Sequence, residues 1–292
     1  MSAPTTLLLD MDGVLAEVSQ SYRSCILLTC QYFLGSAVVT NEIVSARKTS
    51  GGCNNDWILS LELITAHLPP NSPPPTLESV TSKFEELYQG TPTTPGLSSL
   101  ETLIPARGVL VELRRRLPNR MGIVTGRPRK DCETFLRLHD VSTAQELTAV
   151  DHTPVNHTPV DHTPVNHTPV NHTPTYPSHP PVQLTDLFDC CVCMEDGPAK
   201  PDKFPFLKAC ELLSVSPATA VIVGDTPDDI RSGVAAGGAG IAVALPDDDA
   251  RCTLAKVGLE SVGIVKAMVE CGAERVIRPG LAELLDVFGG VM

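Results

Sequence analysis

Aromatic residues are scarce in this 292-residue chain, at 4% of the sequence with a single Trp. The interior must therefore be filled mainly by aliphatic side chains. Basic residues are also few, because 22 Lys and Arg against 34 Asp and Glu give a net charge of −12. A nucleic-acid-binding protein needs a basic surface to replace the counterions of the phosphates, so we expect no nucleic-acid partner. An anionic substrate would need a locally positive site, which a metal ion can supply.

The chain also lacks a long apolar run. The one candidate for a membrane span is Ser24–Asn41, a stretch without a charged residue. It is interrupted by polar residues and a glycine, which favours a buried helix over a membrane span. No basic segment precedes the short apolar run Leu7–Leu9, so no secretory signal is evident. We therefore expect a cytoplasmic protein without membrane contact.

No regular cysteine framework is present, because the ten cysteines are scattered along the chain. This pattern indicates reduced thiols in an intracellular compartment. Cys190 and Cys193 do form a C-x-x-C pair. They lie in the apolar segment Leu187–Met194, however, and a strand there would point them to opposite faces. We therefore do not expect a zinc site.

Short apolar segments alternate with helical patterns over most of the chain, which is typical of a parallel sheet covered by helices on both faces. Functional loops should then lie at the carboxyl ends of the strands. The predicted strands are Thr5–Leu9, Met121–Val124, Leu187–Met194, Ala220–Val223, Gly240–Ala244 and Arg275–Ile277. The predicted helices are Leu77–Tyr88, Gly108–Arg116, Lys130–Leu138, Phe204–Leu213, Asp228–Ala236 and Leu281–Phe288, with residues 16–68 mostly helical around a break at Gly51–Gly52.

Five pentads of the type DHTPV or NHTPV fill Asp151–Thr175. A proline at every fifth position blocks regular helix, and no packed repeat is that short. We predict that residues 141–183 are a low-complexity, disordered insertion. The pentads hold five of the eight histidines, so weak metal capture is an alternative to a tolerated surface repeat.

Four polar segments follow predicted strands or precede predicted helices. They are Asp10-Met11-Asp12-Gly13, Thr125-Gly126, Lys200-Pro201 and Gly224-Asp225 with Asp228-Asp229 beyond it. Each alone has an ordinary explanation: a polar turn, a helix N-cap, a solvated lysine or an acidic helix start. Asp225 is the least easily explained in this way, because neighbouring acids repel one another unless a cation holds them.

Together, these segments resemble the four motifs of the haloacid dehalogenase superfamily over nearly the whole chain outside the pentads. The resemblance implies an α/β fold with a Rossmann-like parallel sheet core, formed by residues 1–15 and 105–292. It also implies an inserted helical cap at residues 16–104, as in the first subclass of the superfamily. The chemistry implied is Mg²⁺-dependent and passes through an aspartyl-phosphate.

The resemblance also implies catalytic roles for individual residues. Asp10 would attack phosphorus, and Asp12 would protonate the leaving oxygen and then help water attack. Thr125 and the Gly126 amide would hold phosphoryl oxygens, and Lys200 would bridge Asp10 and the phosphate. The third motif of the family usually has a second proline where this chain has Lys203, so Lys203 stays an alternative to Lys200.

The metal ligands implied by the resemblance are oxygen atoms, which suit Mg²⁺. Asp10 and Asp225 would supply carboxylates and Asp12 its backbone carbonyl. Asp229, or alternatively Asp228, would orient metal-bound waters.

Substrate contacts are expected from the segment Gly51–Trp57 of the cap and from the start of the helix after Gly126. The candidates are Asn54, Asn55, Trp57, Gly126 and Arg127. The alternative for the first segment is a helix start with Trp57 as a core anchor, and for Arg127 a solvated helix start. Residues 51–57, 90–96, 103–108 and 127–131 also resemble a subgroup of the superfamily, some members of which are linked with histidine biosynthesis and so with histidinol phosphate.

The sequence thus predicts a phosphatase acting on a small phosphomonoester. A phosphomutase with the same Asp10 and Asp12, or a catalytically silent binding protein of the same fold, are the alternatives. The oligomeric state stays open.

Overall fold

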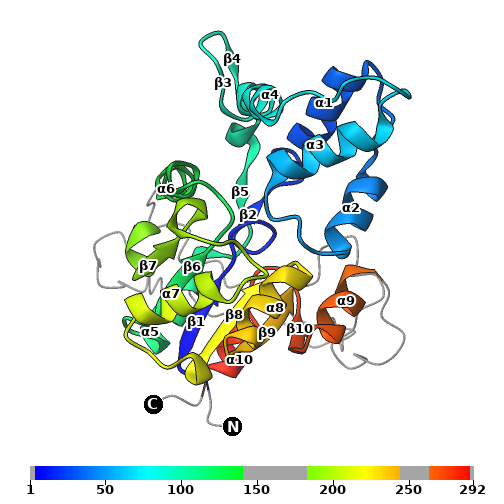
Figure 1. Cartoon of the computed structure of the whole chain (residues 1–292). Helices are drawn as coiled ribbons and strands as arrows, with labels where there is room; N and C mark the ends of the chain where they lie inside the picture. Colours follow the sequence, from blue (N-terminus) through cyan, green and yellow to red (C-terminus); the bar gives the residue numbers. More distant parts are fainter. Residues whose placement is uncertain (1–3, 141–182, 244–262, 290–292) are drawn as a thin grey trace, which may run out of the picture.

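The computed structural model describes residues 4–140, 183–243 and 263–289, so the predicted insertion at 141–183 lies almost wholly outside the described residues. Six parallel strands form the central sheet in the order β10-β9-β8-β1-β6-β7 (Figure 1). The predicted α/β fold with a parallel sheet is confirmed. The strands are β1 (Thr6–Leu9), β6 (Met121–Val124), β7 (Cys190–Val192), β8 (Ala220–Gly224), β9 (Ala239–Val243) and β10 (Ala273–Ile277).

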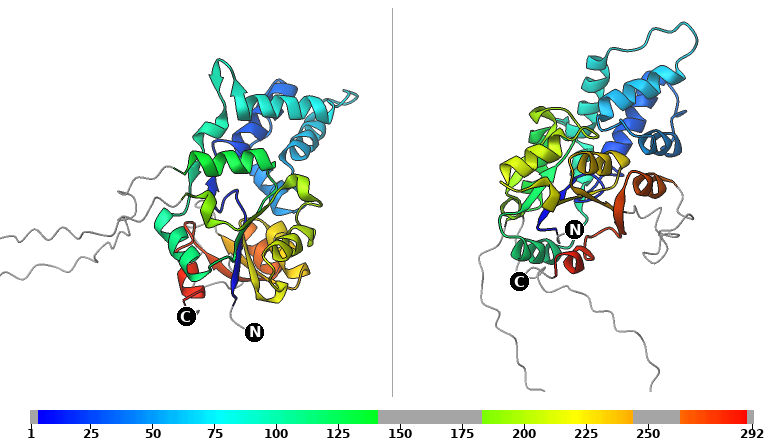
Figure 2. Two further views of the ribbon diagram at one scale, coloured as in Figure 1. Left: turned by 90° about the vertical axis from the view of Figure 1, so that its left-hand side faces the viewer. Right: turned by 60° about the horizontal axis from the view of Figure 1, so that its bottom comes forward.

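Helices cover both faces of this sheet, which is why its strands are apolar on both sides (Figures 1 and 2). Leu7 and Leu9 of β1 lie in an apolar cluster with α5 (Arg107–Arg116), α6 (Arg129–Leu138) and α10 (Leu284–Val287). Leu8 points to the other face, where α7 (Phe204–Leu212) packs. The helices α8 (Pro227–Ala235) and α9 (Ile264–Glu270) cover the same face near β9.

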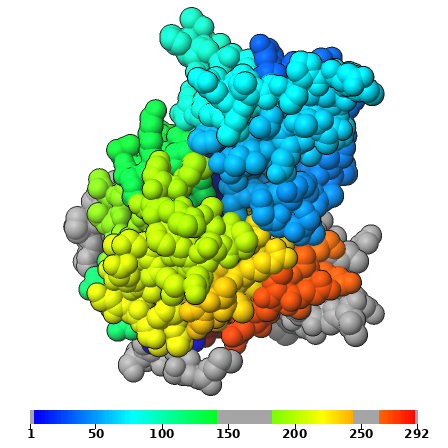
Figure 3. All heavy atoms as spheres, in the orientation of Figure 1, coloured from blue at the N-terminus to red at the C-terminus, as the bar shows by residue number. Residues whose placement is uncertain are grey.

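A separate group of helices stands at one end of the sheet (Figure 2). We call residues 18–101 the helical unit. It contains α1 (Tyr22–Leu34), α2 (Asn41–Thr49), α3 (Asp56–His67), α4 (Leu77–Gln89) and the hairpin of β3 (Gly90–Thr91) and β4 (Thr94–Pro95). Its own apolar core includes the stacked rings of Tyr22, Phe84 and Tyr88. The antiparallel pair β2 (Ala16–Glu17) and β5 (Thr102–Leu103) connects it to the sheet. Figure 3 shows the unit lying against the end of the core.

Some predicted element boundaries are wrong. The strand predicted at Leu187–Met194 is reduced to Cys190–Val192, because β7 is an edge strand whose one neighbour, β6, has only four residues to pair with. The final helix begins at Leu284 rather than Leu281, since Leu281 has a φ of +64°, outside helical geometry. Helix α9 was not predicted at all. Among the described residues, no helix is long and apolar enough to cross a membrane.

Candidate active site

Three of the predicted site residues follow neighbouring strands of the sheet. Asp10 comes directly after β1, Thr125 after β6 and Asp225 after β8. Strand β1 lies between β6 and β8 in the sheet, so these residues meet at its carboxyl edge. The Asp10 amide is fixed there by donating to the Val223 carbonyl oxygen at 2.9 Å. This edge faces the helical unit in Figure 1.

A cluster of three buried carboxylates lies at this edge. Asp10, Asp225 and Asp229 each offer an oxygen atom, and these atoms lie within 4.8 Å of one another. Asp229 enters the cluster from the first turn of α8, where it also accepts hydrogen bonds from Thr226 in a capping box. Burial and the neighbouring carboxylate of Asp229 raise the pKa of Asp225 to about 7. Burial also raises the pKa of Asp10 well above its ordinary value.

Lys200 supplies positive charge within this cluster. Its side chain is 2% exposed, and its Nζ lies 2.7 Å from Asp10 Oδ1 and 2.5 Å from Asp229 Oδ1. It also donates to the Val124 carbonyl oxygen at 3.1 Å. Burial lowers the pKa of Lys200, but the two adjacent carboxylates raise it by more, so the amine stays charged. Lys203 is exposed at the start of α7 and does not reach the cluster.

Gly13 permits the sharp turn that follows Asp12. Its φ of +73° lies in the left-handed region, and its amide donates to the Ala16 carbonyl oxygen at 2.9 Å. A Cβ at this position would lie 2.2 Å from Oδ2 of Asp225. Only glycine therefore allows the loop after β1 to lie against Asp225 without strain.

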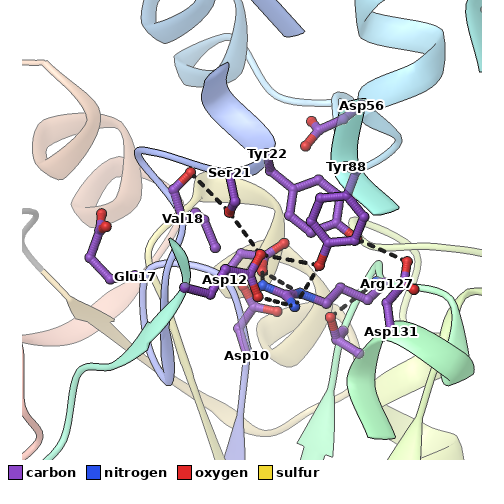
Figure 4. Close-up of polar contacts among 12 residues, drawn as sticks. Asp10, Asp12, Glu17, Val18, Ser21, Tyr22, Asp56, Tyr88, Arg127 and Asp131 are labelled. Atoms are coloured by element: carbon purple, nitrogen blue, oxygen red, sulfur yellow. Dashed lines mark hydrogen bonds and ion pairs between the residues drawn. The ribbon is translucent and has the colours of Figure 1, made fainter. Parts of the chain in front are cut away.

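Asp12 takes part in a second network, which is centred on Arg127 (Figure 4). The Arg127 side chain is 1% exposed and pairs with Asp12 at 2.6 Å and with Glu101 at 2.8 Å. It also donates to the Tyr88 hydroxyl at 3.2 Å and lies over the Tyr22 ring, 4.8 Å from its centre. The network joins the loop after β1 to the helical unit and to Glu101 beside β5.

Arg127→Met should lower the free energy of unfolding by about 3–5 kcal/mol, because removing one partner of a buried ion pair leaves a buried charge uncompensated. Urea unfolding followed by circular dichroism measures this. Adding Glu101→Gln should restore part of the loss, since it neutralises the carboxylate left without its cation. Arg115→Met is the control, because Arg115 pairs with Glu112 on the surface and should cost less than about 1 kcal/mol. Equal effects of the Arg127 and Arg115 variants would contradict a structural role for the buried network.

A polar pocket lies between the carboxylate cluster and the helical unit. From the core, Asp10, Asp12, Gly126, Asp225, Thr226 and Ile264 line it. From the helical unit, Val18, Tyr22, Arg23, Lys48, Asn54 and Asp56 line it. Lys48 and Asp56 form an ion pair at 2.9 Å. Burial lowers the pKa of Lys48, but Asp56, Asp12 and Asp225 together raise it by more, so a charged amine lies on the side of the pocket opposite the carboxylate cluster.

The segment Gly51–Trp57 contributes to the pocket through one of its three predicted contacts. Asn54 lines the pocket, and its amide donates to the Lys200 carbonyl oxygen at 2.5 Å and to Asp228 Oδ2 at 3.0 Å. The Asn55 side chain instead caps α3, accepting from the amides of Trp57 and Ile58. Trp57 packs against the core of the helical unit and donates from its indole to Glu85 at 3.1 Å. These two side chains therefore have structural partners of their own.

Two other predicted substrate contacts differ in position. Gly126 lines the pocket, whereas Arg127 is buried on Asp12 and Glu101 and is absent from the residues that line it. The Thr125 hydroxyl accepts from the Arg127 amide at 3.1 Å, and its own amide donates to the Val192 carbonyl oxygen at 2.9 Å. Asp228 contacts the helical unit and is not part of the carboxylate cluster. Its carboxylate accepts from the Gly52 amide at 2.7 Å as well as from Asn54.

Comparison with known proteins shows what part of this arrangement is similar to. The family model of the haloacid dehalogenase-like hydrolases matches residues 177–243, the segment with Lys200, Asp225 and Asp229. This segment of the chain is therefore similar to the haloacid dehalogenase-like hydrolases. Two solved structures share the fold of the chain. A predicted phosphoglycolate phosphatase of Haemophilus somnus 129PT is 15% identical with a TM-score of 0.58, over 98% of this chain and 99% of that chain. CbbY of Rhodobacter sphaeroides, in complex with phosphate, is 17% identical with a TM-score of 0.55, over 94% and 93%.

A more similar relative is an imidazoleglycerol-phosphate dehydratase of Phytophthora nicotianae. It is 39% identical over 292 residues, which are 100% of this chain and 54% of that protein. The present chain thus spans about half the length of this relative.

Several residues of this candidate site were not predicted as functional. Arg23 and Lys48 line the pocket, and Glu101 and Tyr88 anchor Arg127. The sequence carried little signal for them, because each lies in an ordinary amphipathic or turn segment. Asp56 lay inside the segment singled out beside Trp57, and its acid next to two amides was the one available signal.

Proposed function

We propose that the protein is a Mg²⁺-dependent phosphatase that hydrolyses a small phosphomonoester through a phosphoryl group carried on Asp10. The observation that carries the proposal is the meeting of Asp10, Asp225 and Asp229 with Lys200 at the carboxyl edge of the sheet. A carboxylate is a weak nucleophile, and it accepts a phosphoryl group only where the developing negative charge is offset. A buried lysine between two acids is suited to that task.

The carboxylate cluster fits a divalent cation. Its ligands are oxygen atoms, which Mg²⁺ prefers, and Lys200 pairs directly with two of the three buried acids, Asp10 and Asp229. Burial is the main cause of the raised pKa values of Asp10 and Asp225, and the neighbouring carboxylates add to it, so a bound cation would favour the ionised forms of both acids. Asp10 and Asp225 would hold the ion with the Asp12 carbonyl, and Asp229 would orient its waters. When bound, Mg²⁺ supplies positive charge to the phosphoryl oxygens.

The residues of the chain would act in two steps. In the first, an Asp10 carboxylate oxygen attacks phosphorus, and Asp12 gives a proton to the leaving oxygen. In the second, Asp12 accepts a proton from water as the water attacks, releasing phosphate and restoring Asp10. The pairing with Arg127 at 2.6 Å would hold the Asp12 carboxyl group in position for both steps. The Gly126 amide and the Thr125 hydroxyl would hold phosphoryl oxygens.

The helical unit would act as a cap that chooses the substrate and excludes water. Its contacts from Gly52 and Asn54 to Asp228 hold it against the core beside the site. Arg23, Lys48 and Asp56 face the carboxylates across the pocket and would contact the part of the substrate beyond the phosphate.

Mg²⁺ should restore the activity of protein stripped with EDTA, whereas Ca²⁺ should not, because its looser coordination does not favour in-line attack. Mg²⁺ should also raise the melting temperature, and by more as the pH rises from 5 to 8. In the metal-free protein the raised pKa of Asp225 stabilises the fold below pH 4, and this contribution is lost as the pH rises through about 7. Metal binding needs the ionised carboxylate, so the affinity for Mg²⁺, and with it the stabilisation by Mg²⁺, rises over the same pH range. Differential scanning fluorimetry measures the shift. Full activity in EDTA, or a Mg²⁺ shift that falls with pH, would contradict the metal site.

A panel of phosphate esters with released phosphate measured tests the substrate class. The panel should include imidazoleglycerol phosphate, in view of the name of the Phytophthora relative, and histidinol phosphate. Phosphate release without a bisphosphate activator favours hydrolysis over the phosphomutase alternative. Binding of esters without any turnover would indicate a catalytically silent protein instead.

A further inference from the structure

Three cysteines lie together next to the loop of residues 125–127, on the face of the sheet covered by α6. Cys132 is in the first turn of α6, and its Sγ lies 3.7 Å from the Sγ of Cys191 in β7. Cys193 follows β7 by one residue and packs in the same apolar cluster as Cys132. Cys191 and Cys193 share this face because side chains two residues apart along an extended chain point the same way.

The positions of the thiols differ in a way that suits a reaction between them. Cys132 is fully buried, whereas Cys191 is only partly buried. The Arg129 guanidinium donates to the Cys191 carbonyl oxygen at 3.3 Å and so lies close to this thiol. Hydrogen bonds from the thiols of Cys132 and Cys193, aided by Arg129, lower the pKa of Cys191 to about 4. The thiolate is the reactive form of cysteine.

We propose that Cys132 and Cys191 form an oxidation site, at which a hydroperoxide joins the two sulfur atoms in a reversible disulfide. The Cys191 sulfur attacks the peroxide oxygen, the O–O bond breaks, and Cys191 becomes a sulfenic acid while the leaving oxygen takes a proton. The Cys132 sulfur then attacks the Cys191 sulfur, the S–O bond breaks and water leaves. The two thiols lose two electrons and two protons, and hydrogen peroxide is reduced to two waters. From 3.7 Å the sulfur atoms must approach by about 1.6 Å.

The position of this site connects it to the loop that would bind phosphate. The residue between Cys191 and Cys193 is Val192, whose carbonyl oxygen accepts from the Thr125 amide at 2.9 Å. One residue beyond Cys193, the Met194 amide donates to the Arg127 carbonyl oxygen at 3.0 Å. The segment that would be drawn toward α6 thus holds the loop of residues 125–127 at both ends. Disulfide formation should therefore lower turnover, at least threefold, and a reducing agent should restore it; this consequence rests on the proposed function.

Peptide mapping of the wild-type protein tests the bond without reference to activity. Protein treated with hydrogen peroxide is alkylated, cleaved before aspartate and analysed by tandem mass spectrometry. We expect peptide 131–139 joined to peptide 189–195, with the loss of two hydrogen atoms, and no joined peptide after dithiothreitol. Peroxide that leaves both thiols open to alkylation, or that joins Cys191 to Cys193 instead, would overturn the proposal.

Three variants assign the sulfur atoms. Cys132→Ala should abolish the joined peptide, with its melting temperature measured to show that it folds. Cys193→Ser should keep it. Cys190→Ser is the matched control, because Cys190 packs against the opposite face of the sheet, and it should also keep the joined peptide. A joined peptide lost in Cys190→Ser and kept in Cys132→Ala would reject the pairing. An unchanged turnover in fully joined wild-type protein that is active when reduced would reject the link to the loop and leave the phosphatase proposal intact.

Discussion

Asp10→Asn is expected to lower kcat/KM by about 10⁴-fold or more while the protein stays folded. An amide oxygen does not accept a phosphoryl group as a carboxylate does, and losing a nucleophile costs factors of this order in other enzymes. The fold should tolerate the change, because Asp10 is one of three buried acids that repel one another. Lys200 keeps Asp229 as its partner at 2.5 Å. Phosphate release under single-turnover conditions, with unfolding in urea, measures both parts.

The comparison with a distant acid makes this result specific. Asp186→Asn removes one negative charge from an exposed position beyond the carboxylate cluster and should leave both turnover and stability unchanged. Asp10→Asn should also reduce the thermal shift that Mg²⁺ produces, which a merely structural role of Asp10 would not require. Turnover within tenfold of the wild type would exclude Asp10 as the nucleophile.

The sequence was informative where a polar residue ends an apolar strand. Asp10, Thr125 and Asp225 were predicted because four polar segments in this order resemble a known set of motifs, and a parallel sheet brings the carboxyl ends of its strands together. Lys200 was predicted from the same resemblance and was preferred to Lys203 for its Lys-Pro pair, and the structure places Lys200 rather than Lys203 against the acids. The order of the strands in the sheet is enough to bring these residues together.

Side-chain partners across elements could not be predicted in the same way. Arg127 was expected at the substrate, but its partner Glu101 lies 26 positions earlier, beside β5, and no local pattern connects the two. Asp228 and Asp229 are adjacent and equally acidic, yet α8 turns one toward Lys200 and the other toward Gly52. One residue along a helix rotates a side chain by about 100°, so such neighbours serve different parts of the molecule.

Lys200→Met is expected to be costly to both catalysis and stability. If Lys200 contacts the transferring phosphoryl group as proposed, removing its charge should lower kcat/KM by at least about 10²-fold. The free energy of unfolding should fall by about 3–5 kcal/mol near pH 8, because Asp10 and Asp229 would be left buried without their cation. The fall should be smaller near pH 5, since the raised pKa values of Asp10 and Asp225 let the cluster take up protons there.

Lys203→Met provides the matched control for this prediction, because Lys203 lies three residues away and is exposed. Urea unfolding at pH 5 and pH 8, with phosphate release at pH 8, separates the two variants. Saturating Mg²⁺ should recover part of the stability lost in Lys200→Met, since both cations offset the same carboxylates, but not the turnover. If Lys203→Met were the more damaging variant, or if Lys200→Met were equally unstable at both pH values, the lysine would not balance the charge of the catalytic acids. The arrangement at the carboxyl edge of the sheet would then lack the positive group that lets Asp10 accept a phosphoryl group.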